Sequence, residues 1–131
     1  MSPPWDFNGT NEGFVGSNYS SITAGTSYAI YTIFSSNNDG NGGSAYLNLK
    51  KDSDANINTA DGNYISLTIR NNTRNTRLQV IIPKIGGGNS FTNFNDISAE
   101  DNDFVTYYLD MSNNTHWTGT INNINFRFKT S

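Results

Sequence analysis

At 131 residues, the chain is long enough for one domain with its own hydrophobic core. It has no cysteine, which excludes disulfides and thiol chemistry, and its formal net charge of −3 argues against a nucleic-acid partner, since such binders are usually basic. No apolar run is long enough to cross a membrane, so no membrane partner is expected either. The many Asn, Thr, Ser and Gly residues and the aromatic content of 13% are typical of an all-β protein, and they also suit sugar recognition.

The chain is interpreted as one module of a larger protein. Residues 1–4, Met-Ser-Pro-Pro, have the composition of a linker remnant, and residues 5–131 are expected to form a single domain. No signal segment is found at the start, and the absence of cysteine is compatible with a secreted bacterial protein. We therefore expect a monomeric, extracellular module.

Period-2 alternation and turn residues predict strands along the whole chain. In chain order they are expected at 5–7, 14–15, 28–34, 45–49, 64–70, 77–82, 104–111 and 121–129. Pro83 ends one strand, and the three glycines at 86–88 predict a flexible connection. Gly, Asn and Thr interrupt every window in which a helical stripe could develop. About eight antiparallel strands at this spacing predict an all-β jelly-roll sandwich.

The last two predicted strands assign side chains to the core and to the surface. In 104–111, Val105, Tyr107 and Leu109 share one face, and Phe104, Thr106 and Tyr108 share the other. In 121–129, the residues expected inward are Ile124, Phe126 and Phe128, and those expected outward are Asn125, Arg127 and Lys129.

The stretch from 64 to 82 carries the clearest alternation in the chain. Two β-type runs, at 64–70 and 77–82, flank the polar turn Asn-Asn-Thr-Arg-Asn-Thr. Folded as a hairpin, they match apolar residues on one side and polar residues on the other, and a slip of one residue would expose every apolar side chain. The apolar pairs are Ile69 with Leu78, Leu67 with Val80 and Ile65 with Ile82, and the polar pairs are Arg70 with Arg77 and Thr68 with Gln79.

Candidate catalytic groups are few. His116 is the single histidine, and nothing in the sequence nominates a serine and a carboxylate as its partners. The two glutamates, Glu12 and Glu100, fall in turn-like stretches, so a carboxylate pair for glycoside cleavage is not indicated. A lyase could combine Tyr107, His116 and Arg127, and a small polysaccharide lyase stays an alternative. We expect that the chain is not an enzyme.

A calcium site is considered at two places. Residues 52–56 alternate oxygen ligands as a calcium loop does, but Ile57 stands where an EF-hand needs glycine and Asn63 where it needs an acidic residue. The other place is the N-terminal edge, where Asp6 or Glu12 would bind a structural Ca²⁺ together with backbone carbonyls. Turn chemistry alone also accounts for both clusters.

Three groups of motifs, in this order, resemble a known family. They are Trp5-Asp6-Phe7-Asn8 with Asn11-Glu12-Gly13-Phe14, then Tyr64-Ile65-x-Leu67-x-Ile69-Arg70-Asn71-Asn72-Thr73, then Tyr108-x-Asp110-Met111-x-Asn113 with Trp117-x-Gly119-x-Ile121 and Phe126-Arg127-Phe128. Their order and spacing are similar to those of the galactose-binding-like β-sandwich modules attached to bacterial polysaccharide-degrading enzymes, especially those of marine Bacteroidetes. The resemblance covers nearly the whole chain. It implies a non-catalytic carbohydrate-binding module on a secreted glycoside hydrolase or polysaccharide lyase.

The chain departs from the family pattern at two places. Phe14 stands where a tryptophan is common, and Lys129 and Thr130 follow the last strand where an acidic residue near a calcium site is frequent. The second departure argues against bound calcium. Trp117, in the loop before the last strand, could stack on a sugar, but a structural role beneath Gly119 is the favoured interpretation.

We expect the polar side of the predicted hairpin to belong to one polysaccharide-binding surface. Two arginines held side by side repel unless an anionic or strongly hydrogen-bonding group lies between them. Guanidinium groups grip sulfate or carboxylate oxygens, so an anionic algal polysaccharide is the first choice of ligand and a neutral glucan or galactan the second. A structural or adhesion domain that docks a protein is the alternative, and it should carry a contiguous apolar patch. The predicted carbohydrate-binding residues are Arg70, Arg77, Gln79, Tyr108, Arg127 and Trp117.

Overall fold

The computed structural model of the chain describes residues 5, 7, 9–10, 12–16, 20–26, 29–33, 48–51, 54–72 and 75–129. In this part the chain is all-β, which confirms the predicted class, and none of its helices is long and apolar enough to cross a membrane. The strands are β1 (Val15–Gly16), β2 (Ser20–Ala24), β3 (Ala29–Ile33), β4 (Asn48–Lys51), β5 (Ile57–Asn58), β6 (Tyr64–Ile69), β7 (Arg77–Pro83), β8 (Asn89–Phe94), β9 (Val105–Asp110), β10 (Thr120–Ile121) and β11 (Ile124–Lys129). A short 3-10 helix, η1 (Thr59–Asp61), lies between β5 and β6.

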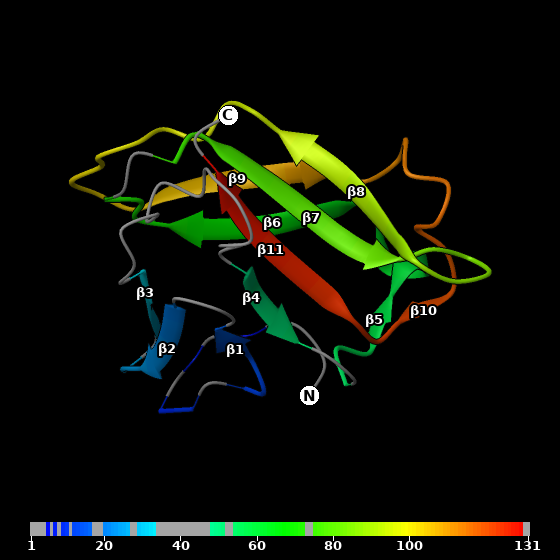
Figure 1. The fold of residues 1–131 in the computed structure, drawn as a ribbon, viewed down its shortest axis with the longest axis horizontal. Helices are drawn as coiled ribbons and strands as arrows, with labels where there is room; N and C mark the ends of the chain where they lie inside the picture. The colour runs from blue at the N-terminus through cyan, green and yellow to red at the C-terminus, as the bar shows by residue number, and fades with distance from the viewer. Residues whose placement is uncertain are drawn as a thin grey trace.

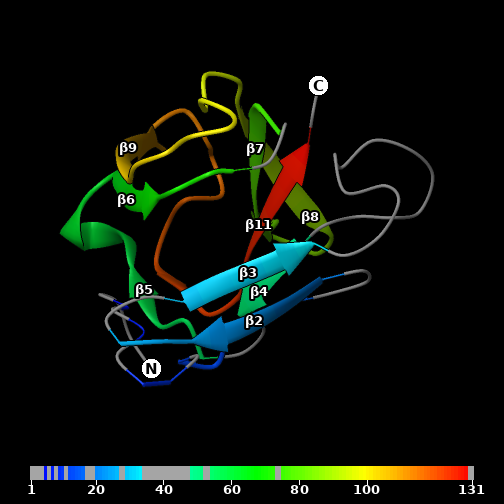
Figure 2. The same ribbon diagram turned by 90° about the vertical axis from the view of Figure 1, so that its left-hand side faces the viewer.

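Five strands form the main sheet, in the order β1-β4-β11-β7-β8, and all neighbours are antiparallel. The other pairs are β6 with β9, β2 with β3 and β5 with β10, again antiparallel. The β6–β9 pair lies behind β7 and β11 in Figure 1, and Figure 2 shows the same two layers from the side. The arrangement is a β-sandwich, and its jelly-roll connectivity stays a prediction.

The core lies between the main sheet and the β6–β9 pair. The main sheet buries Leu78, Val80, Ile82, Ile124 and Phe126. The facing layer buries Leu109 and packs Ile65, Leu67, Ile69 and Tyr107 against the same cluster. Full burial of an aliphatic side chain contributes about 1.5–3 kcal/mol relative to exposure. Matching alternation in the two layers therefore holds them face to face, and the inward residues expected in 121–129 are confirmed.

Phe14 joins the N-terminal segment to this core. Its ring lies edge-on to Trp5, with 5.0 Å between the ring centroids, and contacts Phe7 and Phe126 at 5.6 and 6.4 Å. Neither Trp5 nor Phe7 belongs to a strand, so the strand expected at 5–7 is not formed by these residues. The N-terminal segment is instead fixed by aromatic packing.

The predicted hairpin between 64–70 and 77–82 is wrong. β6 pairs with β9, so that Ile65 faces Leu109 and Thr68 faces Thr106, whereas β7 lies in the other layer between β11 and β8. The connection is anchored by buried Asn71, whose Nδ2 donates to the backbone oxygens of Asn75 and Ser98 at 2.7 and 2.8 Å. Alternation predicted which side of each strand is buried, but both layers of a sandwich satisfy the same alternation.

The three glycines form a tight turn rather than a flexible connection. Lys84 N donates to Gly88 O at 2.9 Å and Gly87 N donates to Lys84 O at 3.1 Å, which closes the β7–β8 hairpin. All three glycines have positive φ, a conformation that costs other residues free energy. The sequence analysis therefore missed β8, and it also missed β2, β5 and β10, which carry few alternating apolar residues or are very short.

A pair of engineered cysteines distinguishes the observed pairing from the predicted hairpin. The hydroxyl oxygens of Thr68 and Thr106 lie 2.8 Å apart across β6 and β9. The chain has no cysteine of its own, so the variant Thr68→Cys/Thr106→Cys should form one intramolecular disulfide on mild oxidation. Non-reducing electrophoresis and thiol counting measure it.

The matched control is Thr68→Cys/Gln79→Cys, which places the cysteines at the facing positions of the predicted hairpin. Because β6 and β7 lie in different layers, this variant should keep two free thiols when it is folded. A disulfide in the control, and none in the first variant, would contradict the observed pairing.

Candidate functional site

The structure separates the residues that were expected to share one surface. Arg77, Gln79 and Arg127 occupy the outer side of the main sheet, where they alternate with buried residues of β7 and β11. Arg70 and Tyr108 belong to the outer side of the β6–β9 pair, on the opposite layer. The prediction of a single surface is therefore corrected to two surfaces.

The outer side of the main sheet is ordered in three rows across its strands. The register aligns Lys50, Asn125, Ile81 and Phe91 in one row, Arg127, Gln79 and Asn93 in the next, and Lys129 and Arg77 in the third. Successive rows lie about 6.6–6.8 Å apart, which is two residues along a strand. The name "cationic face" is used here for Lys50, Arg77, Gln79, Phe91, Asn93, Asn125 and Arg127.

Planar side chains bind one another across the cationic face. Gln79 Nε2 donates to Asn93 Oδ1 at 2.9 Å, and Arg77 Nε donates to Asn95 Oδ1 at 3.1 Å. The Arg127 guanidinium carbon lies 5.6 Å from the centroid of the Phe91 ring, within the range of a cation–π contact. These contacts hold the polar groups in fixed positions before any ligand arrives.

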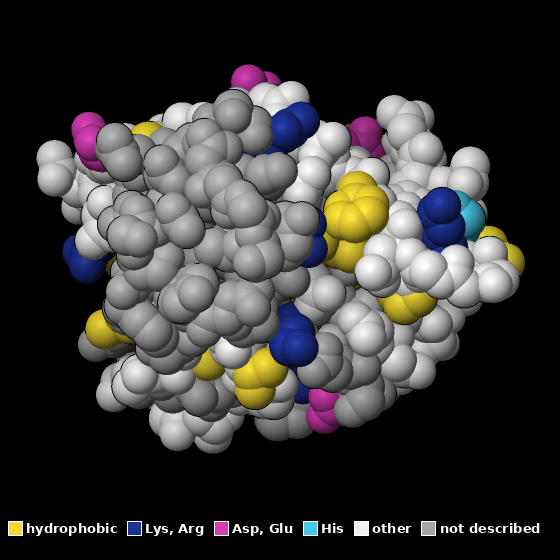
Figure 3. Space-filling view, in the orientation of Figure 1, with side chains coloured by type: hydrophobic (Ala, Val, Ile, Leu, Met, Phe, Trp, Pro, Cys, Tyr) yellow, Lys and Arg dark blue, Asp and Glu magenta, His cyan; other side chains and the backbone are white. Residues whose placement is uncertain are grey.

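The described strands of the cationic face carry positive charge. No Asp or Glu occupies an outward position in the described strands of the main sheet. Lys129, rather than Arg70, is the residue opposite Arg77 in the register. Figure 3 views this side and shows Lys and Arg side chains next to hydrophobic ones over the middle of the molecule.

Two acceptor atoms on this face lack a hydrogen bond. Gln79 Oε1 and Asn125 Oδ1 are buried and have no partner in the described part of the chain. The register makes them diagonal neighbours on β7 and β11, a relation with a typical separation of about 7–8 Å. A buried acceptor without a donor costs about 1–3 kcal/mol.

A hollow of about 340 Å³ borders the cationic face at the edge strand β8. Its lining residues are Ser90, Phe91, Thr92, Asn93, Asn113, Asn114, Thr115 and His116. Asn114 Nδ2 donates to the hydroxyl oxygens of Ser90 and Thr92 at 2.9 and 2.8 Å, and Ile85 N donates to His116 Nδ1 at 3.0 Å. A second hollow, of about 380 Å³, lies between β8 and β9 and includes Asn93 and Tyr108.

The outer side of the β6–β9 pair has a different character. Three aromatic side chains stand out from it, with exposed fractions of 63% for Tyr64, 57% for Phe104 and 70% for Tyr108. Ser66, Thr68 and Thr106 lie between them, and the Arg70 guanidinium carbon lies 5.6 Å from the Phe104 ring centroid. The name "aromatic face" is used for Tyr64, Ser66, Thr68, Arg70, Phe104, Thr106 and Tyr108.

Trp117 lies on neither surface. Its ring packs against the core, and its Nε1 donates to Gly62 O at 3.1 Å. These contacts join the segment after β9 to the one that precedes β6. They agree with the structural role that was the favoured interpretation for this residue.

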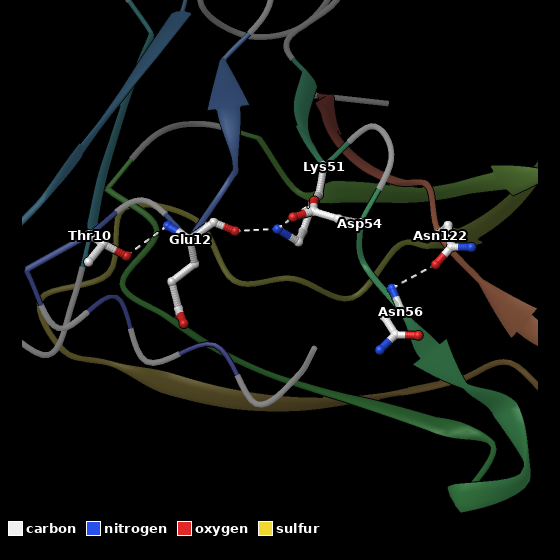
Figure 4. A network of polar contacts seen from close by, with 6 residues as sticks. All are labelled: Thr10, Glu12, Lys51, Asp54, Asn56 and Asn122. Atoms are coloured by element: carbon white, nitrogen blue, oxygen red, sulfur yellow. Dashed lines mark hydrogen bonds and ion pairs between the residues drawn. The ribbon is translucent and has the colours of Figure 1, made fainter. Parts of the chain in front are cut away.

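The N-terminal edge holds an ammonium group where a calcium ion was considered. Asp6 lies outside the described residues, and buried Glu12 accepts a hydrogen bond from Phe7 N through Oε2 at 3.0 Å. Lys51, with an exposed fraction of 0%, donates from Nζ to the backbone oxygen of Glu12, as Figure 4 shows. No cluster of three metal-binding side chains occurs among the described residues, and the calcium site at Asp6 or Glu12 stays a prediction.

Lys51 is held by three different partners. Besides the Glu12 oxygen, its Nζ lies 2.9 Å from Asp54 Oδ1 and 5.7 Å from the centroid of the Phe14 ring. A Cβ added at Gly13 would collide with the same nitrogen, so the glycine leaves room for the ammonium. The ion pair with Lys51 lowers the pKa of Asp54 to about 2.

We expect Asp54→Asn to remove an acid-sensitive part of the stability. The pKa of Asp54 falls from 3.8 to about 2 on folding, so its contribution is complete above pH 3.8, declines as the pH drops toward 2 and vanishes below that. The urea unfolding midpoints of wild type and Asp54→Asn should therefore differ at about pH 6 and converge at about pH 2.

Lys51→Met, which keeps a long side chain in the same buried place, should lose the same pH dependence. If the gap between wild type and Asp54→Asn persists unchanged at about pH 2, the ion pair is not its cause.

Sequence reasoning missed Phe91, Asn93, Asn114 and the hollow beside them because β8 was not predicted. The signal was present in the glycine turn followed by residues 89–94, which resembles the second half of a hairpin. Comparisons of the sequence with known protein families and with curated proteins, and of the fold with solved structures, find no match.

Proposed function

We propose that the chain binds an anionic polysaccharide through its cationic face and carries an attached glycoside hydrolase or polysaccharide lyase to that substrate in the extracellular space. One observation carries the proposal. The main sheet presents arginine, amide and aromatic groups in register, with no carboxylate among its described outward positions.

Each kind of group has a role in this proposal. Arg77 and Arg127 bind sulfate or carboxylate oxygens by charge-assisted hydrogen bonds, which are about twice as strong as neutral ones. Asn93, an exposed residue held by Gln79, offers its amide group to sugar hydroxyls. Phe91, with 49% of its surface exposed, offers an apolar ring against which a sugar face can pack.

The proposal assigns no catalysis to the chain, and two contacts support this. In a serine–histidine–aspartate triad, Nδ1–H of the histidine donates to a carboxylate, whereas Nδ1 of His116 accepts from Ile85 N. The Tyr107 hydroxyl is bound to Ser98, at 3.0 Å from Ser98 N and 2.9 Å from its Oγ. Neither side chain is arranged as an acid or base for a sugar.

Arg127→Ala and Arg77→Ala should each weaken binding to an anionic polysaccharide identified on an array of sulfated and uronate algal glycans. Loss of a hydrogen bond to a charged group costs about 1.5–3 kcal/mol, which corresponds to roughly ten- to a hundredfold in Kd. Isothermal titration at low and high salt measures the effect, and wild-type binding should weaken as salt rises because ions screen the charges.

Lys84→Ala is the matched control, because it removes one positive charge from the exposed β7–β8 turn, outside the cationic face. It should change Kd by less than about twofold, as for a screened charge at a distance. Equal losses in Lys84→Ala and Arg127→Ala would indicate non-specific attraction. Unchanged binding in both arginine variants, with folding intact, would show that the polysaccharide does not bind at the cationic face.

Incubation of the chain alone with the same polysaccharides should release no product. Reducing-end and unsaturated-product assays measure product release. We expect none because His116 Nδ1 accepts a hydrogen bond from Ile85 N and the Tyr107 hydroxyl is hydrogen-bonded to Ser98. A product that survives repurification and disappears in His116→Ala or Tyr107→Phe would contradict the non-catalytic role.

A further inference from the structure

We infer that the aromatic face is a second, separate polysaccharide-binding site, and that it takes a neutral glycan. The inference rests on the proposed function, and it adds a ligand of different charge on the opposite layer of the sandwich. It does not depend on the cationic face for its residues, so the two sites can be tested independently.

The strand register sets the positions of the three exposed rings. Tyr64 on β6 lies opposite Asp110, and Tyr108 on β9 lies opposite Ser66, which makes the two tyrosines diagonal neighbours about 7–8 Å apart. Phe104 precedes β9 and is four residues from Tyr108, or about 13 Å along an extended chain. The rings are therefore spread along the pair of strands, as a linear ligand requires, and are not gathered into one spot.

Hydroxyl groups fill the space between the rings. Thr68 and Thr106 face each other at the centre, with their hydroxyl oxygens 2.8 Å apart, and Ser66 lies beside Tyr108 in the register. Each hydroxyl both donates and accepts, as the hydroxyls of a sugar do. The alternation of ring and hydroxyl matches a pyranose, which has apolar faces and a polar rim.

The distribution of charge selects a neutral ligand. Arg70, at one end, lies against the Phe104 ring. Asp110, at the other end, accepts hydrogen bonds from the Ser112 side chain and from Ser112 N, the latter at 2.8 Å, and both lower the pKa of its carboxyl group. The central part of the face has no ionisable group other than the tyrosine hydroxyls. The cationic face has the opposite pattern, with several cations and no acid at its described outward positions.

A protein partner fits this surface less well. Protein-docking patches on soluble domains are contiguous and apolar, whereas here Ser66, Thr68 and Thr106 separate Phe104 from the two tyrosines. The rings are more than half exposed, so they are not needed to complete the core. With sites on opposite layers, one monomer would bridge two polysaccharide chains, one neutral and one anionic.

The test uses affinity electrophoresis in gels that contain a neutral β-glucan, galactan, mannan or xylan. We expect wild type to be retarded by at least one of them, and Tyr64→Ala and Tyr108→Ala each to bind about tenfold more weakly, as for the loss of one aromatic contact. Tyr108→Phe, which keeps the ring, should retain most of the binding. The matched control is Ile85→Ala, since Ile85 is an equally exposed apolar residue in the β7–β8 turn.

Each outcome decides the inference separately from the proposed function. If no neutral polysaccharide retards the chain, or if the tyrosine variants migrate as Ile85→Ala does, the second site is absent even when Arg127→Ala has lost anionic binding. If Tyr64→Ala converts a dimer to a monomer in light scattering, the aromatic face is a self-association surface and the inference is overturned. If Arg127→Ala binds anionic glycan normally while Tyr64→Ala loses the neutral one, only the cationic site fails.

Discussion

The rest of the structure depends on the position of β11 in the middle of the main sheet, hydrogen-bonded to β4 on one side and to β7 on the other. This last strand joins residues 48–51 to residues 77–83, and its side chains alternate strictly between the two sides of the sheet. Ile124 and Phe126 enter the core, whereas Asn125 and Arg127 face outward. A slip of one residue would exchange the two sets, so the same ladder determines both the core and the cationic face.

The two outer faces follow from the same geometry. A sandwich buries one side of each sheet and leaves the other side for polar or aromatic groups, and the two outward sides of this chain differ in charge. The main sheet collects cations and amides, while the β6–β9 pair collects tyrosines, Phe104 and hydroxyls. The two faces lie on opposite layers, and Asn93 of the cationic face and Tyr108 of the aromatic face line the same hollow between β8 and β9.

At the N-terminal edge, the charged side chain of Lys51 is buried. Removing an ammonium group from water is costly unless other groups replace its hydration. Lys51 contacts a backbone oxygen, a carboxylate and an aromatic ring. Its hydrogen bond to Asp54 lowers the pKa of that carboxyl group. Glu12 holds the N-terminal chain by accepting a hydrogen bond from Phe7 N. A lysine thus provides the positive charge at this edge.

The sequence by itself determined the all-β class, the inward and outward sides of the longest strands and the outward positions of Arg77, Gln79 and Arg127, because alternation and composition are local properties. It also indicated a structural role for Trp117. Only the tertiary structure decided which strands are neighbours, since β6 and β7 have interchangeable patterns that suit one hairpin or two layers equally well. That choice depends on contacts between distant segments, namely β9 with β6 and β11 with β7. Because of this strand pairing, Arg70 and Tyr108 lie on the opposite layer from Arg77, and Phe91 and Asn93 lie beside Arg127.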